Sequence, residues 1–183
     1  MTWEKRPVAA FVEEMAQREI PSPAAGSSLA LTLAMACSLV EMTLSELSKK
    51  EQAVPGRETD RDWAQVRAWR QQALTLIDAD IFAVERMIRL REKDPDSLLQ
   101  PMVQLFECAG QLGEMLLAYL DVENGKISDT VAALLHVRTV WLGSAHILRF
   151  NARAFGWPLG DQLSGWEERL HRWDGKLEEM MSK

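Results

Sequence analysis

Apolar side chains recur at intervals of three and four residues along nearly the whole chain, the spacing that places them on one face of an α-helix. Strict alternation of apolar and polar residues, which is typical of half-buried strands, is nearly absent. The pattern predicts six helices, over about residues 7–16, 26–50, 61–92, 95–120 and 128–155, with the last beginning near Asp161. Proline and glycine separate the helices, as at Pro55 and Gly56. We therefore predict an all-α fold: a single-domain bundle of about six mostly antiparallel helices over residues 1–183.

The segment Leu29–Val40 is the most apolar part of the chain. It is shorter than the roughly 20 residues needed to cross a bilayer, and Glu41 follows it. We expect it to lie in the central and most buried helix and not in a membrane. No apolar segment follows the N-terminal charges, so we expect no signal peptide. Cys37 and Cys108 lie in apolar helical segments, which favours free thiols and a cytoplasmic protein.

Composition agrees with a globular domain and excludes several functions. The 183 residues are 47% hydrophobic, which is enough for a core. A net charge of −6 argues against binding to nucleic acid, which depends on a basic surface. Carboxylate-bridged metal bundles need two Glu-x-x-His pairs, and the chain has one, at Glu168 and His171. We therefore expect no metal site.

Two segments near the N-terminus carry a family resemblance. Phe11-Val12-Glu13-Glu14-Met15-Ala16 is followed by the turn Pro23-Ala24-Ala25-Gly26-Ser27 and by an alanine-rich helix that reaches Met42. This arrangement resembles the start of the formimidoyltetrahydrofolate cyclodeaminase and methenyltetrahydrofolate cyclohydrolase family. That family begins with a short helix and a Pro-Gly-Gly-Gly-Ser turn into an alanine-rich helix.

Three further motifs follow in the order and at nearly the spacing of the family. Thr75-Leu76-Ile77-Asp78-Ala79-Asp80 resembles its aspartate-bearing helix, and Pro101 resembles the proline before its next apolar helix. Ser128-Asp129, with Gly143 and Asn151 after it, resembles a later Ser-Asp, Gly, Asn pattern. The resemblance covers about residues 11–155.

The resemblance implies folate one-carbon chemistry in a helical homodimer. The cyclodeaminase, a lyase, closes a formimino group onto a second folate nitrogen and releases ammonia, whereas the cyclohydrolase opens the methenyl ring with water. A tetrahydrofolate derivative would be the substrate, with no tightly bound cofactor. Both reactions move protons, so a positioned acid/base is required. In the family, an aspartate on the third helix is taken as that group.

Two aspartates, Asp78 and Asp80, compete for this role, and they point about 200° apart on a helix. Asp80 falls in a largely apolar row with Ala73, Leu76, Ala83, Met87 and Leu90. Asp78 shares a mostly polar side with Gln71, Thr75, Phe82, Glu85 and Arg89. Burial would raise the pKa of Asp80 toward the range of an acid/base. The alternative is a structural aspartate paired with an arginine on another helix.

The remaining candidate residues would line the ligand, and each has a structural alternative. They are Pro23, Gly26, Ser27, Ser28, Asp129, Gly143 and Asn151. The serines and Asp129 could instead cap helices. Gly143 could instead allow close helix packing, and the amide of Asn151 needs a partner if it is buried.

The chain departs from the family pattern at Ala24 and Ala25, which replace two turn glycines, and at Ile147, where an asparagine is expected. If the turn requires positive φ, each alanine costs about 1–2 kcal/mol, or the loop takes another shape. The link before Pro101 is also short, so part of a pocket wall could be missing. These departures favour an alternative, a divergent non-catalytic helical dimer that binds another small ligand or a protein partner.

Overall fold

The computed structural model describes residues 2–17, 20–91, 94–122, 125–159 and 163–182. A short 3₁₀ helix, η1 (Trp3–Lys5), precedes six α-helices. These are α1 (Val8–Met15), α2 (Ala25–Lys49), α3 (Thr59–Arg89), α4 (Pro95–Leu120), α5 (Ile127–Phe155) and α6 (Trp166–Met181). The described residues include no strand, so the predicted all-α bundle is confirmed. The predicted boundaries at Glu92 and Asp161 lie outside the described residues.

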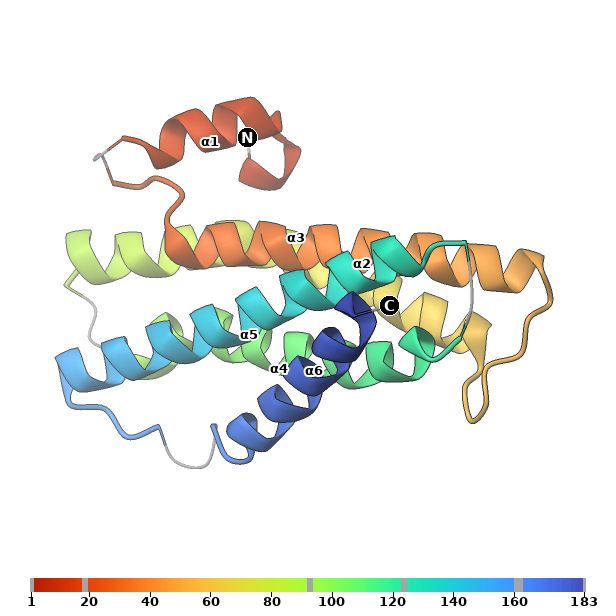
Figure 1. Ribbon diagram of the computed structural model, residues 1–183. Helices are drawn as coiled ribbons and strands as arrows, with labels where there is room; N and C mark the ends of the chain where they lie inside the picture. Colours follow the sequence, from red (N-terminus) through yellow and green to blue (C-terminus); the bar gives the residue numbers. More distant parts are fainter. Residues whose placement is uncertain (1, 18–19, 92–93, 123–124, 160–162, 183) are drawn as a thin grey trace.

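The four long helices, α2 to α5, run lengthwise, whereas α1 lies outside them and α6 crosses α4 and α5 (Figure 1). Two contacts define how α2 and α5 pair. Thr43 meets Thr130 through their hydroxyls, 2.8 Å apart, and Leu29 packs against Gly143. Residue numbers rise along α5 as they fall along α2, so these helices are antiparallel. The N-terminal end of α2 and the C-terminal end of α5 therefore lie at the same end of the bundle.

The hydrophobic core draws on helices along the whole chain. The sequence predicts α2 as the most buried helix, and this is wrong, because α4 buries more of its residues than α2 does. By length and composition, α2 and α5 could each cross a membrane. Both helices, however, supply core residues such as Leu33 and Val137, and the central helices of a bundle meet the same criterion.

Helix ends follow local rules in α4 and depart from them in α5. The carboxylate of Asp94 accepts the backbone N–H of Ser97 at 3.2 Å and caps α4, with Pro95 in the first turn. For α5, Ser128 and Asp129 have the residue types of an N-cap, but both lie inside the helix. The helix begins at Ile127, one residue earlier than predicted, its cap residue is Lys126, and no side chain caps it.

Candidate functional site

Asp80 of α3 lies directly against Gly26 in the first turn of α2. A Cβ atom on Gly26 would lie 2.2 Å from Oδ1 and 2.7 Å from Oδ2 of Asp80. Real Cβ contacts are never this close, so only glycine leaves room for the carboxyl group. The one family glycine that this turn retains is therefore the one that makes room for Asp80.

The surroundings of Asp80 raise the pKa of its carboxyl group above the ordinary value for an aspartate. Burial raises its pKa from 3.8 to about 6, and the backbone N–H of Ser27 lowers it by a smaller amount. Among the described residues, no lysine or arginine contributes to this shift. The sequence left open that Asp80 pairs with an arginine on another helix. Among the described residues, no arginine contributes to the pKa of Asp80. A carboxyl group with a pKa near 6 can both accept and release a proton close to neutral pH.

The turn before α2 forms without the two missing glycines. Ala24 adopts an extended conformation, with φ −141° and ψ −156°, and Ala25 is already helical. Neither alanine has positive φ, so neither carries the strain of about 1–2 kcal/mol expected for alanine in that conformation. The turn instead takes a backbone conformation that alanine adopts freely.

The hydroxyls of this turn bond locally. The N–H of Ala24 donates to Oγ of Ser27 at 2.7 Å, and the Ser27 hydroxyl lies 3.0 Å from the carbonyl oxygen of Ala24. The Ser28 hydroxyl donates to the carbonyl of Ala25 at 2.8 Å. The side chain of Ser27 thus takes the capping alternative, whereas Ser28 is half-buried beside the exposed Ala24 and Ala25.

Gly26→Ala is expected to lower the free energy of unfolding by about 1–3 kcal/mol, because the new methyl group would displace the Asp80 carboxyl group or separate α2 from α3. Urea denaturation measures the change. Gly175→Ala is the matched control, because it lies inside α6 with open space around its Cβ position. There we expect a gain of about 0.5–1 kcal/mol from helix propensity. Equal effects at both positions would contradict the close approach.

Asp78 has a structural role at the N-terminus. Its Oδ1 accepts the backbone N–H of Trp3 at 2.8 Å, and Oδ2 lies 3.5 Å from the N–H of Glu4. The sequence places Asp78 on a mostly polar side of α3, yet it is buried, because η1 folds back over it. Asp78 therefore caps η1 from a distant helix, and the two aspartates face different surroundings.

Asp78→Ala is expected to destabilise the N-terminal segment, because two backbone N–H groups lose their acceptor. A lost cap costs about 1 kcal/mol. Hydrogen exchange measured by NMR should show faster exchange at the Trp3 and Glu4 amides, with core amides unchanged. Gln71→Ala, at an exposed position of the same helix, is the control and should change nothing. Unchanged exchange at Trp3 in Asp78→Ala would disprove the capping role.

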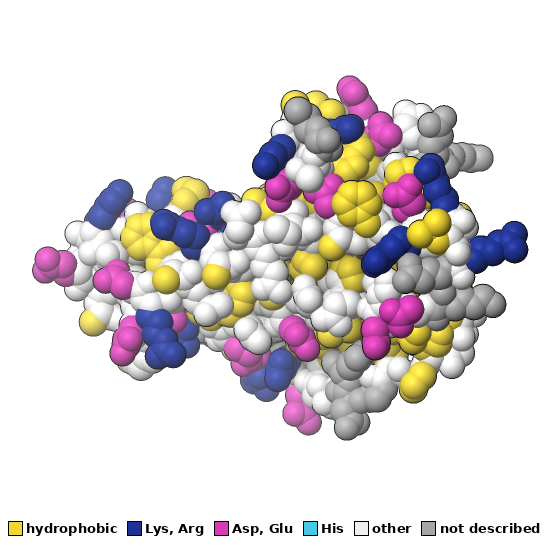
Figure 2. All heavy atoms as spheres, turned by 180° about the vertical axis from the view of Figure 1, so that it is seen from behind, with side chains coloured by type: hydrophobic (Ala, Val, Ile, Leu, Met, Phe, Trp, Pro, Cys, Tyr) yellow, Lys and Arg dark blue, Asp and Glu magenta, His cyan; other side chains and the backbone are white. Residues whose placement is uncertain are grey.

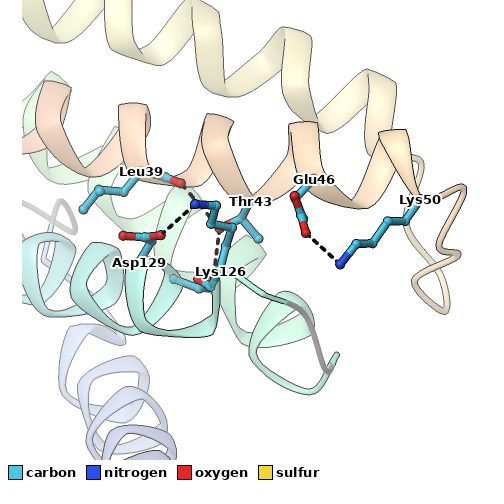
Figure 3. Close-up of polar contacts among 7 residues, drawn as sticks. Leu39, Thr43, Glu46, Lys50, Lys126 and Asp129 are labelled. Atoms are coloured by element: carbon cyan, nitrogen blue, oxygen red, sulfur yellow. Dashed lines mark hydrogen bonds and ion pairs between the residues drawn. The ribbon is translucent and has the colours of Figure 1, made fainter.

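Asp129 does not join the other predicted residues. It lies in the first turn of α5, 3.9 Å from Nζ of Lys126 and beside Thr43 of α2 (Figure 3). Thr43 is 17 residues beyond Gly26 along α2. At 1.5 Å per residue, this is about 25 Å. The two aspartates of the predicted site, Asp80 and Asp129, therefore lie toward opposite ends of the bundle.

The other three predicted ligand residues lie at the Asp80 end. Pro23 is buried just before α2. Gly143 provides space for Leu29, since a Cβ there would lie 2.8 Å from the Leu29 methyl groups, which supports the close-packing alternative. Asn151 is half-buried two turns further along α5, toward the N-terminal end of α2.

A second buried aspartate was missed by the sequence reasoning. Asp62 accepts the hydroxyl of Tyr119 at 2.6 Å and Nε of Arg57 at 2.7 Å, both on Oδ2. These bonds tie the segment before α3 to α4. One signal could have revealed this cluster: Tyr119 is the only tyrosine of the chain and lies in an apolar helix, where its hydroxyl needs a partner.

Among the described residues, no group of three or more histidine, cysteine, aspartate or glutamate side chains is arranged to hold a metal ion. Cys37 and Cys108 are buried free thiols, as predicted. Burial raises the pKa of Cys108 to about 11 and that of Cys37 to about 12, so neither is a reactive thiolate near neutral pH.

Known proteins resemble this chain in the part that carries the α2 turn and Asp80, and in the overall fold. A family model described as formiminotransferase-cyclodeaminase matches residues 7–97, which include the α2 turn and Asp80 but not Asp129, Gly143 or Asn151. No curated protein sequence matches the chain. The crystal structure of formiminotetrahydrofolate cyclodeaminase from Thermotoga maritima is similar, with a TM-score of 0.70 and 19% identity, and the match covers 96% of this chain and 91% of that chain. At this identity, the likeness shows the fold.

Proposed function

Because the chain belongs to the formiminotransferase-cyclodeaminase family, we propose that it is a folate one-carbon enzyme that cyclises formimidoyltetrahydrofolate with release of ammonia. One observation supports a specific catalytic residue for this reaction. The carboxyl group of Asp80 has a pKa of about 6 and faces the turn that the family model covers. Such a group is the acid/base that this chemistry requires.

The proposed reaction needs one proton to move between two nitrogens. The formimino group on N5 reacts in its protonated form. The N10 nitrogen of the folate attacks its carbon, so that the formimino nitrogen becomes an amine, and the N10 proton passes to ionised Asp80. The protonated carboxyl then donates to the amine on the same carbon. The carbon–nitrogen bond to that amine breaks, and ammonia and the methenyl ring are the products. At pH 7, a group with a pKa of about 6 is about nine-tenths ionised, so the base form dominates at the start.

The start of α2 is the proposed rim of the substrate site. Pro23 lies just before the helix, Gly26 and Ser28 lie in its first turn, and the exposed Ala24 and Ala25 leave the backbone open to a ligand. Asn151, at the same end, is a candidate to donate or accept through its amide. Asp129 is too distant to serve the same pocket in one chain. The reaction exchanges one carbon–nitrogen bond for another and transfers protons without a change of oxidation state, so we propose a tetrahydrofolate derivative as substrate and no tightly bound cofactor. We also propose a cytoplasmic location, which the two free thiols favour.

The experiment follows methenyl absorbance after purified protein is added to formimidoyltetrahydrofolate. We expect the absorbance to rise faster than in buffer, with one ammonia released per methenyl group. A parallel arm starts from methenyltetrahydrofolate. Loss of absorbance there, without formation from the formimino substrate, would identify a cyclohydrolase and contradict the cyclodeaminase proposal. Rates equal to buffer in both arms would overturn the enzymatic function and favour the non-catalytic alternative.

We also propose that the chain forms a homodimer. From Ala25 to Val40, α2 has no charged residue, and its outward side leaves Met35 and Met42 each 44% exposed. On α5, Leu135 and Phe150 are exposed as well. Sedimentation equilibrium at micromolar concentration should give twice the chain mass of 20.7 kDa. Met35→Lys should shift the equilibrium toward monomer, because it places a charge on this surface. A wild-type monomer would contradict the proposal.

A further inference from the structure

The start of α2 directs a backbone N–H group at Asp80. The first backbone hydrogen bond of the helix runs from the N–H of Ser28 to the carbonyl oxygen of Ala24, at 2.9 Å. The three N–H groups before that of Ser28 have no acceptor inside the helix. One of them, the N–H of Ser27, hydrogen-bonds to the carboxyl group of Asp80 on α3. Asp80 therefore accepts from the start of α2 as a capping side chain does, but from a different helix.

The side chain of Ser27 fixes the turn that carries this N–H group. Its hydroxyl accepts the N–H of Ala24 at 2.7 Å and lies 3.0 Å from the carbonyl oxygen of the same residue. Ser27 is completely buried, so water does not compete for these bonds. Because the hydroxyl bonds to both backbone groups of Ala24, it holds the Ser27 backbone in one orientation.

The carboxyl group of Asp80 lies against the backbone of the same turn. A Cβ atom on Gly26 would lie 2.2 Å from Oδ1 of Asp80, so the carboxyl group has the backbone of α2 as its wall. A small rotation of the turn would therefore change the angle between the Ser27 N–H and the carboxyl oxygen. Hydrogen bonds weaken steeply when this angle falls below about 120°.

Charges elsewhere do not replace this hydrogen bond. On the face of the molecule shown in Figure 2, basic side chains are interspersed with acidic ones, without a large area of one sign. From Ala25 to Val40, α2 has no charged residue. No titratable side chain on any of the described helices contributes to the pKa of Asp80, which burial raises and the N–H of Ser27 lowers. Within the described part of the chain, this N–H is thus the group that favours the ionised carboxylate.

We propose that Ser27 is a positioning residue for Asp80: its hydroxyl closes the turn with Ala24 and thereby directs the Ser27 N–H at the carboxyl group, which stabilises the ionised form. This role goes beyond capping α2, because the hydroxyl sets the fraction of Asp80 that is ionised at a given pH. The consequence for turnover rests on the proposed function, whereas the consequence for the titration of Asp80 does not.

Titration of the Asp80 carboxyl carbon by NMR tests the proposal without substrate, and Asp80→Asn identifies the signal by its loss. Ser27→Ala should raise the pKa of Asp80 by about one pH unit, because the hydrogen bond to the charged form is weakened. Ser28→Ala is the matched control. It removes the neighbouring hydroxyl, which donates to the carbonyl of Ala25, and should titrate as wild type. A wild-type titration in Ser27→Ala would overturn the proposal.

Ser27→Thr separates positioning from packing. It keeps the hydroxyl but adds a methyl group at a completely buried position, so we expect lower stability in urea and an unchanged titration of Asp80. A shift as large as that of Ser27→Ala would show that the hydroxyl is not the cause. If Ser27→Ala does not fold, Ser27→Cys provides the same test, because a thiol is a weaker hydrogen-bonding group and should shift the pKa in the same direction.

The kinetic test compares kcat/KM at pH 6 and pH 8. A carboxyl group with a pKa of about 6 is about half ionised at pH 6, whereas one with a pKa of about 7 is about one-tenth ionised. Ser27→Ala should therefore lower kcat/KM about fivefold at pH 6 and almost not at all at pH 8. Ser38→Ala removes a hydroxyl that donates to the carbonyl of Ala34 in the same helix, and this control should match wild type at both pH values.

The two readings together separate this proposal from the proposed function. An equal loss of kcat/KM at pH 6 and pH 8 in Ser27→Ala would indicate a general structural defect and would overturn the positioning role. A shifted titration of Asp80 in a chain without turnover would overturn only the proposed function.

Discussion

Asp80→Asn is expected to lower kcat for formation of the methenyl product about 10²–10⁴-fold, the contribution usual for general acid–base catalysis. Asparagine keeps the size of the side chain and can still accept the N–H of Ser27, but it cannot exchange a proton near neutral pH. Steady-state kinetics measures the loss. Asp78→Asn is the matched control two residues away, and we expect it to retain kcat because Asp78 serves the N-terminal segment. Equal losses in the two variants would contradict the assignment of roles.

The same Asp80 variant should be more stable than wild type at high pH. The folded pKa of Asp80, about 6, lies above its ordinary value of 3.8, so the folded state binds the proton more tightly than the unfolded state. The stability that this group contributes is greatest below pH 4 and is lost as pH rises through 6. Above pH 7, asparagine should therefore add about 2 kcal/mol, allowing for partial exposure of the site. Urea denaturation at pH 4 and pH 8 should show the gain only at pH 8.

Trp173→Ala is expected to lower the free energy of unfolding by about 3–5 kcal/mol, a large part of the stability of a domain. Trp173 anchors α6 and is completely buried. Its indole lies edge-on to Trp141, at 5.0 Å between ring centroids, and its Nε1 donates to Glu114 at 3.1 Å. Gly113 of α4 leaves the space for it, since a Cβ there would lie 2.2 Å from the ring. Thermal or urea unfolding measures the loss.

Trp166→Ala is the matched control, because Trp166 is in the same helix but only partly buried. It lies under the guanidinium of Arg149, at 4.5 Å from the ring centroid. We expect its replacement to cost about 1 kcal/mol. If the two tryptophans cost the same, α6 is not anchored through Trp173.

Helix positions could be predicted from the sequence because they depend on local rules. Apolar spacing and the prolines and glycines between helices predicted α1 and α4 closely. The start of α5 was wrong because Ser128 and Asp129 have the residue types of a cap but lie inside the helix. Relative burial was wrong because it depends on how many neighbours a helix receives, which the composition of α2 could not reveal.

In the candidate site, too, features set by one helix could be predicted from the sequence, and features set by contacts between helices could not. Helical periodicity separated Asp78 from Asp80, since both lie on one helix. Two other features depend on contacts between segments that are distant in the sequence. The η1 helix covers Asp78, and Gly26 makes room for Asp80. Asp129 was grouped with Asp80 by a motif, whereas the antiparallel pairing of α2 and α5 keeps them apart. The cavity lined by the second half of α3 and the first half of α4 could not be predicted, because two helices form it together.

The pH dependence of kcat/KM for formation of the methenyl product tests the role of Asp80 most directly. If ionised Asp80 accepts the proton from N10, kcat/KM should rise with pH through an apparent pKa near 6, the value that burial imposes on this carboxyl group. The residual activity of Asp80→Asn should lack this rise. A wild-type profile that is flat between pH 5 and pH 7, or a rise that persists unchanged in Asp80→Asn, would contradict the assignment of Asp80 as the base.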